Sequence, residues 1–416
     1  MARESTKAAR RSGGKGPSRA QLRERALAAA AAVNVPSTCD VCVCGAGASG
    51  LVAAISAAEA GAKVVVVERA LECGRTILAT GNGRCNFANE KLDPARYNHP
   101  EFVAEVAGEA WLEDVLGFFA DCGLVWVSEE GRLYPLSRQA ASVREVLLTR
   151  ARKAGVVMAC GREVIGVKAA ADGGWDVAWT GEKPVADGSL HAGSVVVACG
   201  GAEALARSLD LPFVAEKPVL CALACTPEAA ALDLAALDGR RAHVMATLLR
   251  DGTAVFAESG EVLFRPYGIS GIVTFDLSRR AKIGDVVSLD LTCGMSGAAL
   301  ANAAPSGVLD PTIAAAFGDA SLEPLVTACD LRLIVTGTAD EARAQVTRGG
   351  LDVTGFSPAT LEAASAPGLL ACGEALDVDA DCGGFNLAWA WRSGQVAGAA
   401  AAARVATKPG KEPSSC

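Results

Sequence analysis

Short apolar runs separated by glycine-rich turns dominate the N-terminal part of the chain. Residues 39–44 are apolar apart from one aspartate and are typical of a buried strand, and residues 51–60 have the alanine-rich composition of a helix. Gly61 follows in the usual position of a helix C-cap. A second apolar run, residues 63–67, ends at Glu68. The order strand, glycine-rich turn, helix and strand predicts one unit of a parallel α/β sheet.

The same pattern returns later in the chain and is interrupted by a different one. Residues 194–201 and 368–374 read as apolar strands that end in Gly-Gly and in Glu374. Between them, residues 219–292 alternate short apolar runs with turns such as RDGT, which predicts a β-rich segment. Residues 297–330 are alanine-rich and helix-like. We therefore expect an α/β body that is interrupted by a β-rich segment and a small helical segment.

The composition is that of a protein with a large core and no membrane span. The chain has 416 residues, 51% of them hydrophobic, with a mean hydropathy of +0.28, and it has no run of 18 apolar residues. The first 25 residues carry eight basic and two acidic side chains, a charge of +6, so the remainder of the −8 chain carries −14. Residues 1–36 are expected to form a disordered basic tail, with a nucleic-acid arm or a transit peptide as alternatives. Residues 406–416 are expected to form a second flexible tail.

The cysteines and the acidic residues near the C-terminus do not predict a metal site. The fifteen cysteines are scattered and odd in number, so we expect reduced thiols in a cytoplasmic protein. Cys39-x-x-Cys42 lies inside a predicted strand, and no second CxxC pair completes a zinc site. The acidic stretch from Asp377 has Cys382 and Ala388 where a calcium-binding loop needs glycine and glutamate. The twin arginine near the N-terminus is not followed by an apolar segment, so export is not expected.

The turn after residues 39–44 matches a dinucleotide-binding fingerprint. Its glycines allow a tight turn, close approach of the backbone to a pyrophosphate, and close packing of helix on strand. The helix N-terminus supplies free N–H groups and a positive dipole end for the phosphates. A carboxylate after the next strand accepts the ribose hydroxyls and disfavours a 2′-phosphate, so the bound nucleotide is expected to be FAD or NAD. The residues concerned are Gly45, Gly47, Ala48, Ser49, Gly50 and Glu68.

A second glycine-rich loop, residues 74–89, follows the second strand and reads GRTILATGNGRCNFAN. Its backbone donors suit phosphate groups and ring edges, and Arg84 adds a guanidinium fork.

Several segments of the chain together resemble one family. These segments are CGAGASG, TGNGRCNFAN, GRLYPLS, VVVACGG, GEVLFRPYGISG, AQVTRGG and GLLACGEALDVDADCGGFNLAWAWRSGQVAG. On these motifs, residues 38–404 are similar to the bacterial FAD-dependent oxidoreductases described as BaiN-like or aminoacetone-oxidase-like flavoproteins. The resemblance implies an α/β fold in which a Rossmann-type FAD-binding domain, split into N- and C-terminal parts, holds an inserted β-barrel-like domain and a small helical segment. The expected boundaries are 37–210 and 345–405 for the two parts of the FAD domain, 211–295 for the β-rich insert, and 296–344 for the helical segment and return.

The resemblance also implies how the acidic stretch is used. Glu374 would meet the ribityl chain of FAD, and Asp377 would shape the turn that follows. A helix N-terminus would then meet the flavin ring and stabilise negative charge on reduced flavin. Trp389 and Trp391 are expected only to pack this helix, and Asp381 to be a solvated turn residue. The residues at the helix N-terminus are Gly383, Gly384, Phe385, Asn386 and Leu387. Further FAD contacts are implied for Arg69, Arg75, Gly81, Asn82, Gly83, Arg84, Cys85, Asn86, Val164, Ala198, Gly200 and Gly201.

The expected chemistry is that of the flavin itself, because neither a redox disulfide motif nor a Ser-His-Asp order is present. We expect hydride transfer through flavin N5. By resemblance, the reaction is either NAD(P)H-linked reduction of an activated, enone-like C=C bond in a small molecule, or oxidation of a small amine or aminoketone with release of hydrogen peroxide. A non-catalytic flavin-binding protein is the third hypothesis. Only one nucleotide fingerprint is visible, so NAD(P)H would dock transiently.

Two side chains are candidates for a catalytic role. Tyr267 is a candidate general acid, with a strand-end tyrosine whose hydroxyl is already bonded as the alternative. Arg84 is a candidate for holding a flavin oxygen or an anionic substrate, with a loop-bracing arginine as the alternative.

Overall fold

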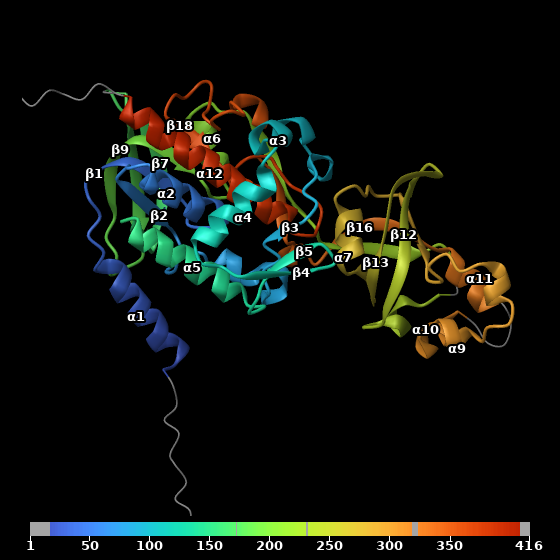
Figure 1. Cartoon of the computed structure of the whole chain (residues 1–416). Coiled ribbons are helices and arrows are strands. Elements are labelled where there is room, and N and C mark those ends of the chain that lie inside the picture. The colour runs from blue at the N-terminus through green and yellow to red at the C-terminus, as the bar shows by residue number, and fades with distance from the viewer. Residues whose placement is uncertain (1–16, 172, 230–231, 318–322, 408–416) are drawn as a thin grey trace, which may run out of the picture.

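The chain folds into an α/β body and a β-barrel that lies to one side of it (Figure 1). This structure, a computed structural model, describes residues 17–171, 173–229, 232–317 and 323–407. Each part has its own hydrophobic core, so the apolar runs of the body and of the insert pack separately. The expected Rossmann-type architecture with a barrel-like insert is confirmed.

Seven strands form the main sheet of the body. In the order β6-β2-β1-β9, with β18 also beside β9, the strands are parallel, and β8 and β7 continue the sheet as an antiparallel hairpin. The central parallel strands β1, β2 and β18 and the second half of β9 are largely buried, which explains their apolar sequences. Their bounds are β1 Thr38–Cys44, β2 Val64–Glu68, β6 Val157–Cys160, β7 Arg162–Ala169, β8 Trp175–Gly181, β9 Gly188–Val197 and β18 Leu369–Ala371.

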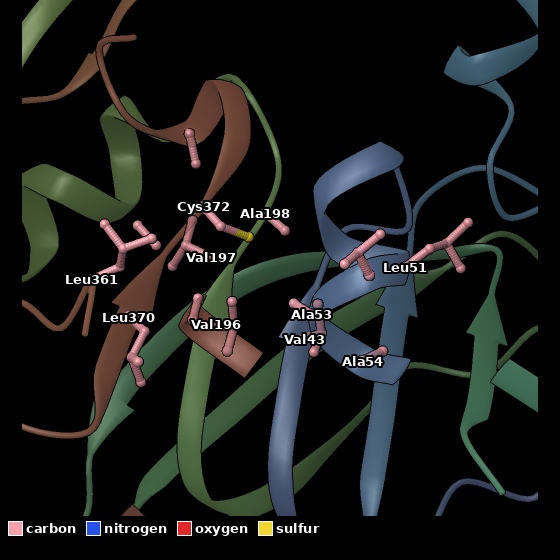
Figure 2. Packing of buried hydrophobic residues seen from close by; sticks show 14 of the residues in the cluster. Val43, Leu51, Ala53, Ala54, Val196, Val197, Ala198, Leu361, Leu370 and Cys372 are labelled. Carbon is pink, nitrogen blue, oxygen red and sulfur yellow. The ribbon is translucent and has the colours of Figure 1, made fainter. Parts of the chain in front are cut away.

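Helix α2 (Ala48–Glu59) packs between α12 (Phe385–Ala406) and α5 (Ala140–Lys153). Glycines let α12 touch α2 backbone to backbone: a Cβ at Gly394 would lie 2.6 Å from the carbonyl oxygen of Ser49. Figure 2 shows the apolar side chains of α2, β1, β9 and β18 that fill this core. Trp389 and Trp391 are 1% and 0% exposed, which confirms the prediction that they pack α12.

Smaller elements cover the body where it faces the barrel. A three-stranded sheet in the order β3-β5-β4 lies beside helices α3 and α4, and short 3-10 turns connect these elements. Their bounds are β3 Ala88–Asn89, β4 Trp126–Glu129, β5 Arg132–Pro135, α3 Pro100–Ala107, α4 Trp111–Asp121 and α6 Glu203–Ser208.

Six strands close the barrel in the order β11-β14-β13-β12-β15-β16. Helices α8 to α11 fall in the stretch expected to be helix-like, and the last strand, β16, lies in the expected return segment after it. The helices are thus an insertion between two neighbouring barrel strands. The bounds are β11 Ala222–Pro227, β12 Arg241–Arg250, β13 Thr253–Arg265, β14 Gly268–Ser270, β15 Val286–Asp290, β16 Leu331–Ala339, α8 Gly297–Leu300, α9 Pro305–Val308, α10 Pro311–Ala316 and α11 Glu323–Cys329.

Two strands and one helix join the barrel to the body. Strands β10 (Phe213–Val219) and β17 (Val346–Leu351) pair antiparallel and carry the chain out of the body and back. Helix α7 (Ile272–Ser278) belongs to the barrel and packs on β13, at the side of the barrel that faces the body (Figure 1).

The N-terminal segment is not wholly a disordered tail. Helix α1 spans Arg19–Ala31, and a capping box formed by Ser18 and Gln21 begins it. Leu27 and Ala30 are buried against Val185, which gives the helix a docking site on the body. The Ser-x-x-Gln pattern of this capping box is visible in the sequence, but the many basic residues around it favoured the prediction of a disordered tail. The predicted disorder of residues 1–16 and 408–416 lies outside the described residues.

None of the described helices is both long enough and apolar enough to cross a membrane.

Candidate active site

The predicted nucleotide-binding residues converge at one edge of the main sheet. Parallel strands bring their carboxyl ends to the same edge, and Gly45, Glu68, Ala198 and Glu374 each follow or end one of the strands β1, β2, β9 and β18. We call these four residues and Cys199 the nucleotide cleft. The sequence placed all but Cys199 here.

The turn after β1 has the tight geometry that its glycines predict. Gly45 has φ +106°, and a Cβ there would lie 2.8 Å from the carbonyl oxygen of Ala198. A Cβ at Gly50 would lie 2.1 Å from the carbonyl oxygen of Gly45. Gly47 is the N-cap of α2 and offers no side-chain cap, so the first N–H groups of the helix receive no capping bond from that residue.

Glu68 is held ready at the end of β2 by backbone donors. Its Oε2 accepts from the N–H of Ala46 at 2.6 Å, and its Oε1 accepts from the N–H of Ala70 at 2.7 Å. Both oxygens keep further lone pairs, so the carboxylate can still accept from ribose hydroxyls.

Two side chains in the cleft are crowded by protein yet keep solvent-accessible surface. Burial among protein atoms, followed by the charges of Asp379 and Glu216, raises the pKa of Glu374 to about 7, although its side chain is exposed. Burial likewise raises the pKa of the Cys199 thiol to about 12, and this cysteine is also exposed.

The second glycine-rich loop adopts left-handed backbone where the sequence has glycine and asparagine. Gly81 and Asn82 have φ +54° and +57°. The loop is so tight that a Cβ at Gly81 would lie 2.8 Å from the N of Asn86. Asn86 Oδ1 is buried and has no hydrogen-bond partner among the described residues, so it is an acceptor that awaits a donor. Arg75 and Gly83 lie at the more open parts of this loop.

Two residues of this loop are placed differently from the prediction. Arg84 donates to Glu129 Oε2 at 2.6 Å and lies over the Tyr134 ring, 4.6 Å from its centroid. Its guanidinium therefore braces the loop against β4 and β5, which is the alternative considered for it. Cys85 is fully buried, and burial raises its pKa to about 12, so it is an inert packing thiol.

The acidic stretch after Glu374 is a buried ion network. Asp379 is 0% exposed and accepts from Arg279 Nε and Arg348 Nε, each at 2.6 Å. Asp381 is 1% exposed and pairs with Arg279 and with Arg280, so the expectation of a solvated turn residue is wrong. Arg279 is the C-cap of α7, Arg280 follows it, and Arg348 lies on β17.

Asp377 and Asn386 brace this loop from within. Asp377 accepts from Asn98 Nδ2 at 3.2 Å, from the N–H of Gly349 at 2.8 Å, and contacts His99 Nε2 at 3.0 Å. The Asn386 side chain exchanges two hydrogen bonds with the backbone of Ala380. Both side chains are engaged within the protein and shape the site, as expected for Asp377; their contact with the cofactor stays a prediction.

The N-terminus of α12 lies beside the unpaired acceptor of the second loop. Gly384 is the N-cap with φ +95°, and a Cβ there would lie 2.9 Å from Asn86 Oδ1. Gly383 and Gly384 thus bring the start of α12 against the loop that carries Asn86. Phe385 is buried, and Leu387 lies half-buried one turn further on.

The remaining candidates lie at the rim of the cleft or outside it. Arg69 is largely exposed and lies 3.4 Å from Glu163, and Gly201 donates its N–H to Glu216. Gly200 is exposed, and Val164 is half-buried on β7. Tyr267 is in the barrel, in the turn between β13 and β14, and donates its hydroxyl to Asp340 Oδ2 at 2.7 Å. Its hydroxyl is therefore already hydrogen-bonded, which matches the alternative to a general acid that the sequence analysis gave for Tyr267.

Comparison with known proteins identifies the family. A profile of the HI0933-like protein Rossmann domain matches residues 39–400. The chain belongs to the HI0933-like family. This agrees with the resemblance drawn from the motifs.

Two kinds of curated relatives cover almost the whole chain. The 3-dehydro-bile acid delta(4,6)-reductase of Clostridium scindens is 34% identical over 414 residues, covering 87% of this chain and 98% of that protein. The ribosomal RNA dihydrouridine synthase of Escherichia coli K12 is 28% identical over 399 residues, covering 85% of this chain and 96% of that protein. Among solved structures, an open flavocytochrome c3 fumarate reductase aligns with a TM-score of 0.49 and 17% identity over 95% of this chain and 83% of that one.

The HI0933-like chain described here is an FAD-dependent oxidoreductase. Its own residues fit that cofactor: the glycine turn leaves room only for backbone, the carboxylate of Glu68 is fixed at the end of β2, and the buried acceptor of Asn86 has no donor among the described residues. The described residues contain no group of three or more His, Cys, Asp or Glu side chains arranged to hold a metal ion.

Proposed function

We propose that this enzyme reduces a C=C bond conjugated to a carbonyl group in a small, apolar molecule, with NAD(P)H as the transient electron donor. The observation that carries the proposal is the shared chemistry of its near-full-length relatives. The name of the Clostridium scindens relative describes reduction of ring double bonds in a 3-oxo bile acid. The name of the Escherichia coli relative describes saturation of uridine to dihydrouridine. Both reactions saturate a double bond that is conjugated to a carbonyl group.

The reaction requires a hydride at one carbon and a proton at the other. FAD, when bound and reduced, supplies the hydride from N5. Gly45, Gly47 and the N-terminus of α2 would hold the pyrophosphate, and Glu68 would hold the adenosine ribose. Glu374 and Ala198 would line the ribityl chain, and the start of α12 would stabilise negative charge on the ring.

The charge of the body favours a small molecule over an RNA substrate. The chain without its first 25 residues carries −14, by the subtraction of +6 from −8. A polyanion binds through a basic surface that neutralises phosphates. Because the folded body repels a polyanion, a small enone is the better substrate class.

The oxidase alternative receives no support from the relatives described above, whose names are those of a reductase and of synthases that form a reduced base. The non-catalytic alternative predicts normal flavin content without turnover, so the same experiment tests it.

The experiment is an anaerobic two-step titration of the FAD-loaded protein. NADH or NADPH is added first, and bleaching of the flavin absorbance is followed. A 3-oxo-4-ene steroid acid, or in parallel a uridine-containing RNA, is then added to the reduced enzyme. We expect bleaching by one of the two nucleotides, reoxidation by the enone, and a product that has gained two hydrogen atoms.

The control is Gly45→Val, which is expected to lack flavin because its side chain would meet the carbonyl oxygen of Ala198, 2.8 Å from the Cβ position. Reoxidation by oxygen alone, with the enone unchanged, would contradict the proposal. Reoxidation of the flavin by the RNA and not by the enone would support the proposed reduction of a C=C bond but would show that the substrate is an RNA and not a small molecule.

A further inference from the structure

A buried and a partly buried carboxyl group, those of Asp276 and Glu258, lie where the barrel meets the acidic loop of the body. Asp276, on α7, is 1% exposed. Helix α7 packs along β13, and one turn beyond Asp276 the Arg280 guanidinium lies 4.0 Å from the centroid of the Phe256 ring. Two residues further along β13, on the same face, Glu258 lies opposite Asp276. Its Oε2 is buried and has no hydrogen-bond partner among the described residues.

This pair retains a proton at neutral pH. Burial, followed by the neighbouring charge of Glu258, raises the pKa of Asp276 to about 8, and Asp381 in the acidic loop acts in the same direction. Two neighbouring carboxylates repel one another, and one proton on the pair removes the repulsion.

Cys382 connects the carboxyl pair to the candidate flavin site through its backbone. Its N–H donates to Asp276 Oδ1 at 2.6 Å, and its partly buried side chain packs against Val219, Leu220 and Val346. It directly precedes Gly383 and Gly384 at the N-terminus of α12, the backbone proposed to meet the flavin ring.

The thiol of Cys382 is kept in its protonated form. Burial, followed by the charge of Asp276, raises its pKa well above the ordinary value; Asp381 adds to the effect, and Arg132 on β5 opposes it. A thiol in such surroundings is a poor nucleophile but retains a proton to give to a strong base.

We propose that Cys382 is the proton donor of the reduction and that the pair Asp276–Glu258 orients and reprotonates it. This inference rests on the proposed function. As the hydride from reduced flavin forms a C–H bond at the β-carbon, the S–H bond of Cys382 breaks and a C–H bond forms at the α-carbon. The substrate gains two electrons and two hydrogens, and reduced flavin becomes oxidised. The resulting thiolate takes the proton of Asp276, and the carboxyl pair regains a proton from water.

The first test separates the two half-reactions. FAD-loaded enzyme is reduced with dithionite under nitrogen and mixed with the enone. Because general acid catalysis contributes about 10²- to 10⁴-fold, we expect Cys382→Ala to slow reoxidation by at least about 100-fold, and Cys382→Ser to slow it less. Reduction by dithionite and flavin content are expected to stay unchanged.

Cys225→Ala is the matched control, since Cys225 is a buried thiol of the barrel that lies outside the relay. Unaltered reoxidation in Cys382→Ala would overturn the proposal.

The pH dependence of the reoxidation rate distinguishes a proton relay from a purely structural role, because substitution of a purely structural residue would not shift it. We expect the reoxidation rate of the unaltered enzyme to fall as the pH rises past about 8, where Asp276 loses its proton. Glu258→Gln removes the neighbouring charge and so lowers the pKa of Asp276. The fall is therefore expected at a lower pH in this variant, and an identical profile would overturn the role of the carboxyl pair.

A third measurement does not depend on turnover. Alkylation of Cys382 by iodoacetamide, followed by peptide mass spectrometry across pH, reports the pKa of this thiol in the full chain. Since the Asp276 charge raises that pKa, Asp276→Asn is expected to shift alkylation to lower pH. If no enone is reduced by the unaltered enzyme, the proposed function fails, and this measurement still decides the relay: an unchanged alkylation profile overturns it, and the expected shift supports it.

Discussion

Glu68 is the residue whose carboxylate most directly tests the nucleotide cleft. Two backbone N–H groups fix its oxygens at the end of β2. Glu68→Gln keeps the size of the side chain and removes the charge that strengthens hydrogen bonds to ribose. Because a hydrogen bond to a charged group contributes about 1.5–3 kcal/mol, we expect FAD affinity to fall by about 10- to 100-fold.

Quenching of FAD fluorescence in an equilibrium titration measures this affinity. Glu163→Gln is the control, because Glu163 is an exposed carboxylate at the rim whose ion-pair partner among the described residues is Arg69. Equal losses in both variants would show that Glu68 has no special contact with the ribose.

Tyr267 provides a contrasting prediction at the same scale. Burial, followed by its hydrogen bond to Asp340, raises the pKa of this tyrosine, which makes it a weaker acid. Tyr267→Phe is therefore expected to keep the reoxidation rate within about threefold, with a loss of about 1 kcal/mol of stability from the missing hydrogen bond. Stopped-flow reoxidation by an enone measures the rate, and a loss of 100-fold would restore Tyr267 as the general acid.

At the scale of elements, the acidic loop and helix α7 form one unit. Four carboxylates in sequence look like a metal-binding loop, yet Asp379 and Asp381 are neutralised by Arg279, Arg280 and Arg348. These arginines lie at the end of the barrel helix and on the return strand β17. The network therefore fixes the barrel against the loop that precedes α12.

Removal of one partner from this network is expected to be costly. Arg279→Met leaves buried charge on Asp379 and Asp381 without its closest partner, and such losses cost about 3–5 kcal/mol. Arg265→Met is the control, since Arg265 forms a partly exposed pair with Asp238 and its loss costs less than about 1 kcal/mol. Urea unfolding at neutral pH measures both values, and equal costs would contradict the importance of burial.

The same variant has a predicted pH dependence. Burial alone would raise the pKa of Asp381, but Arg280 and Arg279 hold it below the ordinary value. A carboxylate with a lowered folded-state pKa stabilises the protein above its unfolded-state pKa, and this stability is lost as the pH falls through the folded-state value. The stability difference between the unaltered enzyme and Arg279→Met is therefore expected to shrink below about pH 4.

At the scale of the whole molecule, the distribution of net charge bears on whether the substrate is a small enone or an RNA, the two substrate classes named for the relatives. The N-terminal 25 residues carry +6 and the remainder carries −14. We expect weak RNA binding at low salt that disappears at about 0.15 M salt, and that is lost when residues 1–31 are deleted.

Fluorescence anisotropy with a uridine-containing RNA measures this binding, and enone turnover by the truncated chain is the control. Tight binding that persists in the truncated chain would favour an RNA substrate.

The sequence alone determined the nucleotide cleft and the order of the elements. Glycine turns and apolar strands depend on backbone sterics and burial that act over a few neighbouring residues, so Gly45, Gly50, Glu68 and the loop at Gly81 could be placed from local pattern. The sheet then brought the strand ends together, as parallel topology requires.

Only the tertiary structure decided which distant side chains meet. Asp381 read as a solvated turn residue because its arginine partners are about a hundred residues away in the chain. Cys73 and Cys160, whose sulfur atoms lie 3.3 Å apart, and Asp276, which faces Cys382, carry no local signal either. Buried ion pairs and thiol contacts arise from long-range packing, which the local pattern of polar and apolar residues does not encode.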